Sequence, residues 1–248
     1  MDGPDLQIGD AADGGPTLGH IGIAAVSPEG AALTYRQIFR EASRLFPDLD
    51  PPRVTVHNEP LGVYIRAVRS DDWPQVAGLL ARSANVLSAA GADVVITPDN
   101  AVQHAVRIVE HESAVPWLAV TDLVAEAVVA DGRGTVGVLG TRWVTQGSAY
   151  QTALGLKGVK VQAPEGEDIE TLDRVIFEEL IYGVVKPASR AALEAIVGRL
   201  ADRGSEALIV ALSEASLVLD LDHAGLPVYD ASALLARGAV ERVASAGG

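Results

Sequence analysis

Residues 90–104, AGADVVITPDNAVQH, carry the pattern that decides the fold. A glycine that can end a helix precedes the short apolar run Asp93–Thr97, and polar residues follow directly before another helical stretch. The same order of helix, glycine and short β-branched run recurs along the chain. Short strands that alternate with helices of about ten residues or more indicate parallel sheets joined by crossover helices. The sequence therefore predicts an α/β fold.

The expected elements form two successive blocks. Strands are expected at Ile21–Val26, Arg53–His57, Asp93–Thr97, Trp117–Val120, Thr135–Gly140, Val159–Gln162, Ala207–Leu212 and Pro227–Tyr229. Helices are expected at Ala31–Leu45, Trp73–Ala90, Ala101–Glu112, Leu123–Ala130, Ser148–Leu154, Ile169–Tyr182, Ala188–Asp202 and Ala231–Ala244. We predict a disordered tail over residues 1–19, a first lobe from 20–116 plus 224–248, and a second lobe from 117–223.

Composition excludes several classes of function. The net charge of −14 comes without a cluster of Lys and Arg, so we expect neither nucleic acid nor an anionic membrane surface as a partner. No apolar run reaches the roughly 18 residues that span a bilayer. Residues 1–19 are acidic and rich in Gly and Pro, unlike a secretion signal, so a cytoplasmic protein is expected. The absence of cysteine rules out disulfides and thiol nucleophiles.

Polar residues follow the predicted strands, where parallel sheets bind their ligands. They are Ser27, His57, Asp99, Asn100, His104, Thr141, Thr145, Ser213 and Glu214. Each has a structural alternative, since Ser27, Thr145 and Ser213 can be helix N-caps, as can Asp99. His104 can be a structural histidine, and Glu214 can complement a helix dipole. The convergence of Asp99-Asn100 and Ser213-Glu214 on equivalent edges of two sheets favours a binding site.

Motifs for cofactors and metals are missing from the sequence. There is no P-loop, no HExxH zinc motif and no GxSxG nucleophile elbow, and the five histidines are scattered. We therefore expect neither a cofactor nor a metal.

Five segments in the same order resemble the cofactor-independent aspartate/glutamate racemase superfamily. They are IGIAAVSPEGAALTYRQI (21–38), AGADVVITPDNAVQH (90–104), GVLGTRWVTQGSAYQ (137–151), SRAALEAIVGRLADRGSEALIVALSEASLVL (189–219) and PVYDASALLARGAV (227–240). The resemblance implies two similar lobes, an active site in the cleft between them, and a homodimer. It also implies acid/base chemistry beside a substrate carboxylate without pyridoxal phosphate or metal.

The resemblance also places the two catalytic positions of the family. Racemases of this family use two thiols, which here correspond to Asp99 and Leu212, so two-thiol racemisation is excluded. It implies that Asn100, Thr141, Thr145, Ser213 and Glu214 bind the substrate. An ordinary Asp is a weaker base than Cys by about 4.6 pKa units, or roughly 6 kcal/mol, and burial can recover part of this deficit.

Our leading hypothesis is an enzyme that uses Asp99 as a general acid/base on a small carboxylate-bearing substrate. The reaction would be an isomerisation, decarboxylation, elimination or cyclisation. The alternatives are an amino-acid racemase or epimerase with altered bases and a catalytically silent relative that binds a metabolite. The predicted catalytic residues are Asp99, Ser213, Glu214 and His104, and the predicted substrate-binding residues are Ser27, His57, Tyr64, Asn100, Thr141, Thr145 and Leu212.

Overall fold

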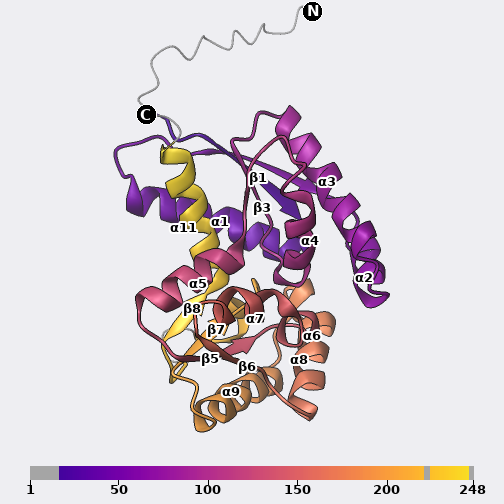
Figure 1. Ribbon diagram of the computed structural model, residues 1–248, viewed down its shortest axis with the longest axis vertical. Coiled ribbons are helices and arrows are strands. Elements are labelled where there is room, and N and C mark those ends of the chain that lie inside the picture. Colours follow the sequence, from indigo (N-terminus) through magenta and orange to yellow (C-terminus); the bar gives the residue numbers. More distant parts are fainter. Residues whose placement is uncertain (1–16, 221–223, 246–248) are drawn as a thin grey trace, which may run out of the picture.

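The computed structural model describes residues 17–220 and 224–245, and within these ranges it contains two four-stranded parallel sheets flanked by helices (Figure 1). The strand order is β2-β1-β3-β4 in the first sheet and β6-β5-β7-β8 in the second. The strands are β1 (His20–Ala25), β2 (Arg53–Asn58), β3 (Val94–Ile96), β4 (Trp117–Leu118), β5 (Thr135–Leu139), β6 (Lys160–Gln162), β7 (Ala207–Val210) and β8 (Val228–Asp230). The predicted α/β architecture with two lobes is confirmed.

Helices connect successive strands and cover the sheets. They are α1 (Pro28–Leu45), α2 (Leu61–Arg69), α3 (Trp73–Ala89), α4 (Gln103–Val109), α5 (Val120–Ala130), α6 (Arg142–Thr145), α7 (Ser148–Gly155), α8 (Glu167–Glu178), α9 (Pro187–Asp202), α10 (Ala215–Val218) and α11 (Ala231–Ser245). Two short 3₁₀ helices, η1 (Asn100–Val102) and η2 (Leu180–Tyr182), complete the set in the described part of the chain. None of the helices in these described ranges is both long and apolar enough to cross a bilayer.

Strand β1 and helix α1 show why the sequence pattern predicts alternating strands and helices. Strand β1 is buried at every position, as expected for a parallel strand that is covered on both faces. Helix α1 follows it at once because Ser27 caps its N-terminus: the Ser27 hydroxyl accepts a hydrogen bond from the Gly30 N–H at 3.1 Å. Pro28 at the first helical position fixes the backbone angle that the helix needs.

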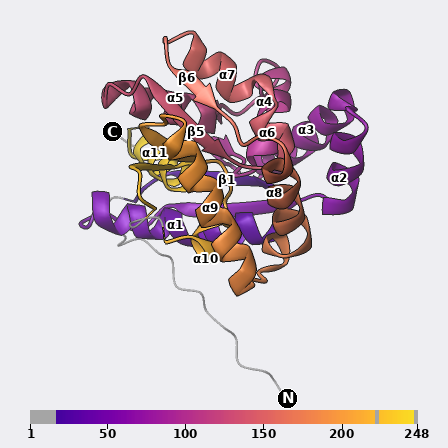
Figure 2. The same cartoon turned by 90° about the horizontal axis from the view of Figure 1, so that it is seen from below.

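The last helix joins the two lobes. Helix α11 leaves strand β8 of the second sheet and packs against α1, α5 and the first sheet (Figures 1 and 2). One continuous hydrophobic core accordingly contains Ile23 and Ile96 of the first sheet together with Val138 and Ile209 of the second. The lobes therefore share part of their core, which fixes the carboxyl ends of their strands relative to one another.

The predicted boundaries of the lobes need three corrections. Trp117–Leu118, assigned to the second lobe, forms β4 and pairs with β3 of the first sheet. Val228–Asp230, assigned to the first lobe, pairs with β7 of the second sheet, and only the helix that follows returns. Of the predicted tail, residues 1–16 lie outside the described residues, but residues 17–19 are ordered. The Leu18 N–H donates to the Asp50 carbonyl at 3.1 Å, and Leu18 is only 4% exposed.

Candidate active site

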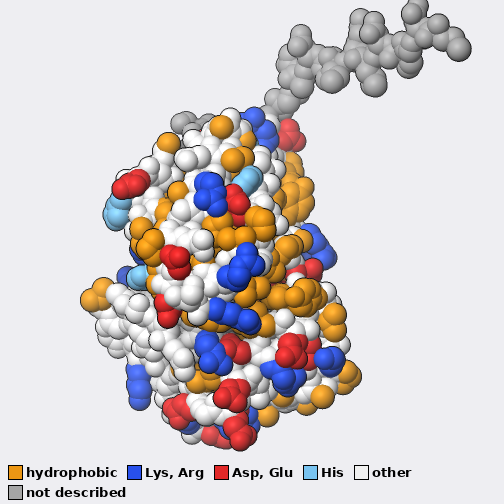
Figure 3. Space-filling model, turned by 90° about the vertical axis from the view of Figure 1, so that its right-hand side faces the viewer, with side chains coloured by type: hydrophobic (Ala, Val, Ile, Leu, Met, Phe, Trp, Pro, Cys, Tyr) orange, Lys and Arg blue, Asp and Glu red, His pale blue; other side chains and the backbone are white. Residues whose placement is uncertain are grey.

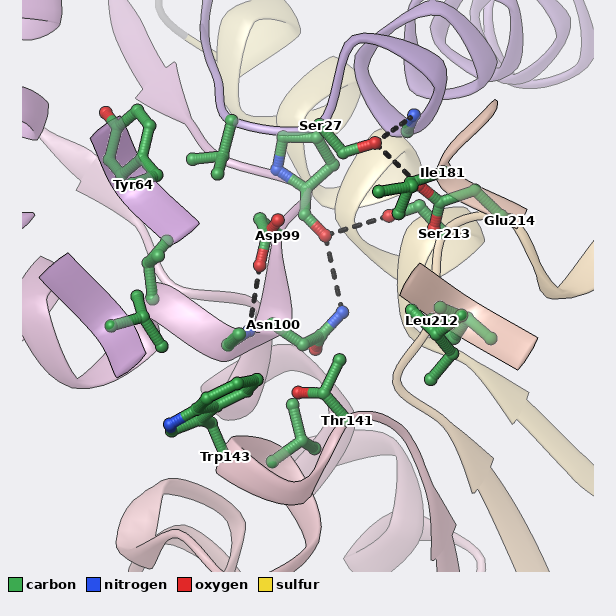
Figure 4. Close-up of a pocket in the computed structure, with 18 of the residues that line it drawn as sticks. Ser27, Tyr64, Asp99, Asn100, Thr141, Trp143, Ile181, Leu212, Ser213 and Glu214 are labelled. Carbon is green, nitrogen blue, oxygen red and sulfur yellow. Dashed lines mark hydrogen bonds between the residues drawn. The ribbon is translucent and has the colours of Figure 1, made fainter. Parts of the chain in front are cut away.

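Loops at the carboxyl ends of strands from both sheets meet at one pocket (Figure 4). The empty space at the pocket is about 740 Å³, a value that includes open solvent at its mouth. Its predicted lining residues, each just after a strand or on the helix that follows one, are Ser27, Tyr64, Asp99, Asn100, Thr141, Leu212, Ser213 and Glu214. Asp99 and Leu212, the two positions at which the sequence resemblance places the family's thiols, line the same pocket.

Two hydrogen bonds connect the strand-end loops of the two sheets. The Ser27 hydroxyl donates to Glu214 Oε1 at 2.6 Å, and the Ser213 hydroxyl donates to the Pro98 carbonyl at 2.9 Å. Gly30 permits this close approach, because a Cβ added there would lie 3.0 Å from the Ser213 Cβ. The loops that carry Asp99 and Glu214 are thus held together by direct contacts.

The Asp99 carboxyl group is shielded from bulk water but keeps some surface toward the pocket. Its Oδ1 accepts a hydrogen bond from the Ala101 N–H at 3.0 Å, which starts the short helix η1. Burial and, secondly, the nearby Glu214 carboxyl raise the pKa of Asp99 from 3.8 to about 7, against the opposing effect of the Ala101 N–H. A carboxyl group with this pKa can both donate and accept a proton near neutral pH.

Glu214 is the second carboxyl group of the pocket and is only 3% exposed. Burial raises the pKa of Glu214, and the hydrogen bond from Ser27 partly offsets this. Glu214 therefore serves two functions in the structure: it accepts a hydrogen bond that connects the lobes, and it raises the pKa of Asp99.

Asn100 and Thr141 supply hydrogen-bonding groups on the floor of the pocket. The Tyr150 hydroxyl donates to Asn100 Oδ1 at 2.6 Å, and Asn100 Nδ2 donates to the Pro98 carbonyl at 3.3 Å. These contacts fix the amide so that its second N–H is available to a ligand. The Thr141 hydroxyl, 8% exposed at the residue level, has no hydrogen-bond partner within the described part of the chain. A buried hydroxyl without a partner is costly unless a ligand or water satisfies it.

Three predicted site residues, His57, His104 and Thr145, are not among those that line the pocket. The His57 ring contacts the Ser83 hydroxyl at 3.0 Å, on the side of β2 that faces α3. The exposed His104 packs edge-on against Trp73. The Thr145 hydroxyl donates to the carbonyl of Thr141, one helical turn back.

Most of the apolar lining was not predicted from the sequence. These residues are Val26, Leu61, Ile65, Val68, Pro98, Ala101, Val102, Trp143, Val144, Ile176, Phe177, Ile181 and Ala211. Among them, Trp143 had a signal, because it lies two residues beyond Thr141 in the loop that was already assigned to the site. Gly30 also lines the pocket, where its lack of a side chain permits the close approach to Ser213.

Comparisons with known proteins agree with this geometry. The model of the Asp/Glu/Hydantoin racemase family matches residues 23–239. A protein of Yersinia pestis assigned to the Asp/Glu racemases is 26% identical, with a TM-score of 0.81 over 92% of this chain and all of the other. An aspartate racemase homologue from Pyrococcus horikoshii OT3 is 24% identical, with a TM-score of 0.77 over 92% and 100%.

More distant structures share the fold alone. The Gly74Cys mutant of arylmalonate decarboxylase is 19% identical, with a TM-score of 0.52 over 94% of this chain and 95% of that one. The family match extends through both lobes and includes every loop that lines the pocket. The chain is therefore a member of the Asp/Glu/Hydantoin racemase family, one that contains no cysteine.

Proposed function

We propose that the protein is a cofactor-independent enzyme in which the Asp99 carboxyl group transfers a proton to or from a carbon beside a substrate carboxylate. One observation carries this proposal: Asp99 faces the pocket, and its pKa is about 7. The sequence resemblance, in addition, places one of the family's thiols at this residue. Near neutral pH both protonation states are populated, so the same group can act as acid in one step and as base in another.

The raised pKa supplies most of the basicity that a thiol would have. An ordinary Asp is weaker than a Cys by about 6 kcal/mol in proton affinity. With a pKa of about 7 against about 8.5 for Cys, the deficit falls to about 1.5 units, or roughly 2 kcal/mol. This makes proton transfer at an acidified carbon feasible for Asp99, with the carbon made acidic by a neighbouring carbonyl, carboxylate or imine.

Leu212 and Ser213 favour reactions that need only one proton-transfer group. Leu212, where the sequence resemblance places the second thiol, lines the pocket and cannot exchange a proton. The hydroxyl of Ser213 is already donated to the Pro98 carbonyl. Isomerisation, decarboxylation, elimination or cyclisation at one face of the substrate therefore fits better than racemisation, which needs a proton donor on the opposite face.

A decarboxylation illustrates how the groups would work. The bond between the carbon and the leaving carboxylate breaks, its electron pair remains on the carbon as an enolate, and neutral Asp99 protonates that carbon. Water then returns a proton to Asp99. Arylmalonate decarboxylase, which has the same fold, is named for a reaction of this class. We propose that the Asn100 amide and the Thr141 hydroxyl bind the carboxylate that stays on the substrate.

The proposal is tested by proton exchange and turnover in heavy water. Carboxylic acids that carry a ketone or a second carboxylate at the α-carbon are incubated with the wild type and with Asp99→Asn in D₂O. Deuterium incorporation and CO₂ release are followed by NMR. Asp99→Asn should lower turnover at least about a hundredfold while leaving ligand binding in place. Full activity in Asp99→Asn would contradict the proposal, and binding without turnover in the wild type would favour a silent binding protein.

A further inference from the structure

One side of the pocket is formed by large apolar and aromatic side chains. They are Leu61, Tyr64, Ile65 and Val68 from α2, Trp143 from α6 and Phe177 from α8, and we call this set the apolar wall. In Figure 4, Tyr64 and Trp143 lie on one side of Asp99, and Ser213 and Glu214 lie on the other. The pocket thus separates an acid/base side from an apolar side.

Several side chains of the apolar wall are only half buried. Trp143 and Phe177 meet edge-on, with ring centroids 5.6 Å apart, and the Arg69 guanidinium lies 5.7 Å from the centre of the Phe177 ring. Helices α2 and α8 belong to different lobes, and the contact between Arg69 and Phe177 connects them. Aromatic surface left open inside a pocket favours a ligand group that removes it from water.

Positive charge is found outside the pocket. Among the described residues that line the pocket there is no Lys, Arg or His. Arginines occur in the adjoining hollow beyond Trp143 and Phe177, on the face shown in Figure 3. The three arginines of this hollow are Arg69, Arg142 and Arg174. Arg142 is ion-paired with Asp173, and Arg174 is ion-paired with Glu179.

An acidic substrate side chain therefore has no counter-charge in the pocket. The two carboxyl groups inside it, Asp99 and Glu214, offer no positive charge to a further carboxylate. Contact with the apolar wall would remove the hydration of an acidic substrate side chain without giving it an ionic or hydrogen-bonding partner, which disfavours binding.

We infer that the reacting carbon of the substrate carries an aryl or branched alkyl group that packs on the apolar wall, and that acidic side chains are rejected. This specificity rests on the proposed function, which places the reacting carbon beside Asp99. The wall, rather than the acid/base residues, is then the part of the site that determines which substrates bind.

The test is isothermal titration calorimetry of the full chain at pH 6 with phenylacetate, 4-methylpentanoate and succinate. Phenylacetate and 4-methylpentanoate should each bind at least about tenfold more tightly than succinate. Phe177→Ala should weaken phenylacetate at least about tenfold. The matched control is Phe39→Ala, which removes a half-buried ring on α1 outside the pocket and should leave the affinity unchanged.

A second variant reverses the charge preference. Phe177→Arg places a cation at the wall and should raise the affinity of succinate relative to phenylacetate by at least about tenfold. Circular dichroism checks that each variant is folded. Succinate binding to the wild type as tightly as phenylacetate, no binding of either apolar acid, or an unchanged ratio in a folded Phe177→Arg would overturn the inference.

The proposed function and the proposed substrate specificity can be contradicted independently of each other. If Asp99→Asn keeps full turnover while Phe177→Ala still abolishes phenylacetate binding, the proposed function is wrong and the specificity stands. If Asp99→Asn abolishes turnover but succinate is the better ligand, the specificity is wrong and the proposed function stands.

Discussion

Replacing Asp99 by Asn should make the stability of the protein less dependent on pH. In the folded protein burial raises the pKa of Asp99 from 3.8 to about 7, so between these values the native state holds a proton that the unfolded chain releases. The free energy of unfolding of the wild type then falls as the pH rises, by up to about 1.36 kcal/mol per pH unit. The whole penalty, about 4 kcal/mol, is present above pH 7 and disappears as the pH falls toward 4.

The asparagine of this variant does not titrate, yet its side-chain oxygen can still accept a hydrogen bond from the Ala101 N–H. Asp99→Asn should therefore gain about 3 kcal/mol of stability relative to the wild type between pH 5 and pH 8. Urea unfolding at half-unit pH steps measures this difference. The control Asp48→Asn removes an exposed carboxyl group and should follow the wild type. Parallel stability curves for the wild type and Asp99→Asn would refute the reasoning, because they would mean that Asp99 titrates normally in the folded state.

Two further substitutions test the surroundings of the site. Thr141→Val keeps the shape but removes a buried hydroxyl that has no partner among the described residues, so urea unfolding should show no loss of stability, whereas calorimetry should show about tenfold weaker phenylacetate binding. Gly147→Ala would place a Cβ 2.1 Å from the Trp143 carbonyl oxygen, so it should lower the free energy of unfolding by at least about 2 kcal/mol. Gly155→Ala, with no atom within 4 Å of the new Cβ, should not.

The fold was largely predictable because the buried parallel strands are short β-branched runs between glycines and helices. Every predicted strand overlaps an observed one, including the two-residue β4. Helix α2 was missed because its sequence, LGVYIRAVR, combines glycine with β-branched residues that are poor helix formers. Lobe membership of β4 and β8 could not be predicted, since strand pairing depends on contacts between distant segments.

The polar part of the site was predictable from strand ends, and the rest depended on side-chain direction. His104 lies five residues after Asp99, but the helix begins as the 3₁₀ turn η1, whose tighter winding changes the direction of later side chains. His57 follows the alternation of β2 and faces α3. An apolar residue that faces a pocket, such as Phe177, has the same sequence pattern as one that faces a core. Apart from Tyr64 and Trp143, the apolar wall therefore left no signal in the sequence.

A carbon-13 NMR titration of the Asp99 carboxyl group measures the pKa on which the proposed function depends. The resonance is assigned by its loss in Asp99→Asn, and its shift is followed from pH 3 to pH 9. Because the Glu214 carboxyl contributes to the raised pKa of Asp99, Glu214→Gln should move the midpoint to lower pH. The wild-type midpoint should lie near pH 7, and a midpoint near pH 4 would contradict the proton-transfer role proposed for Asp99.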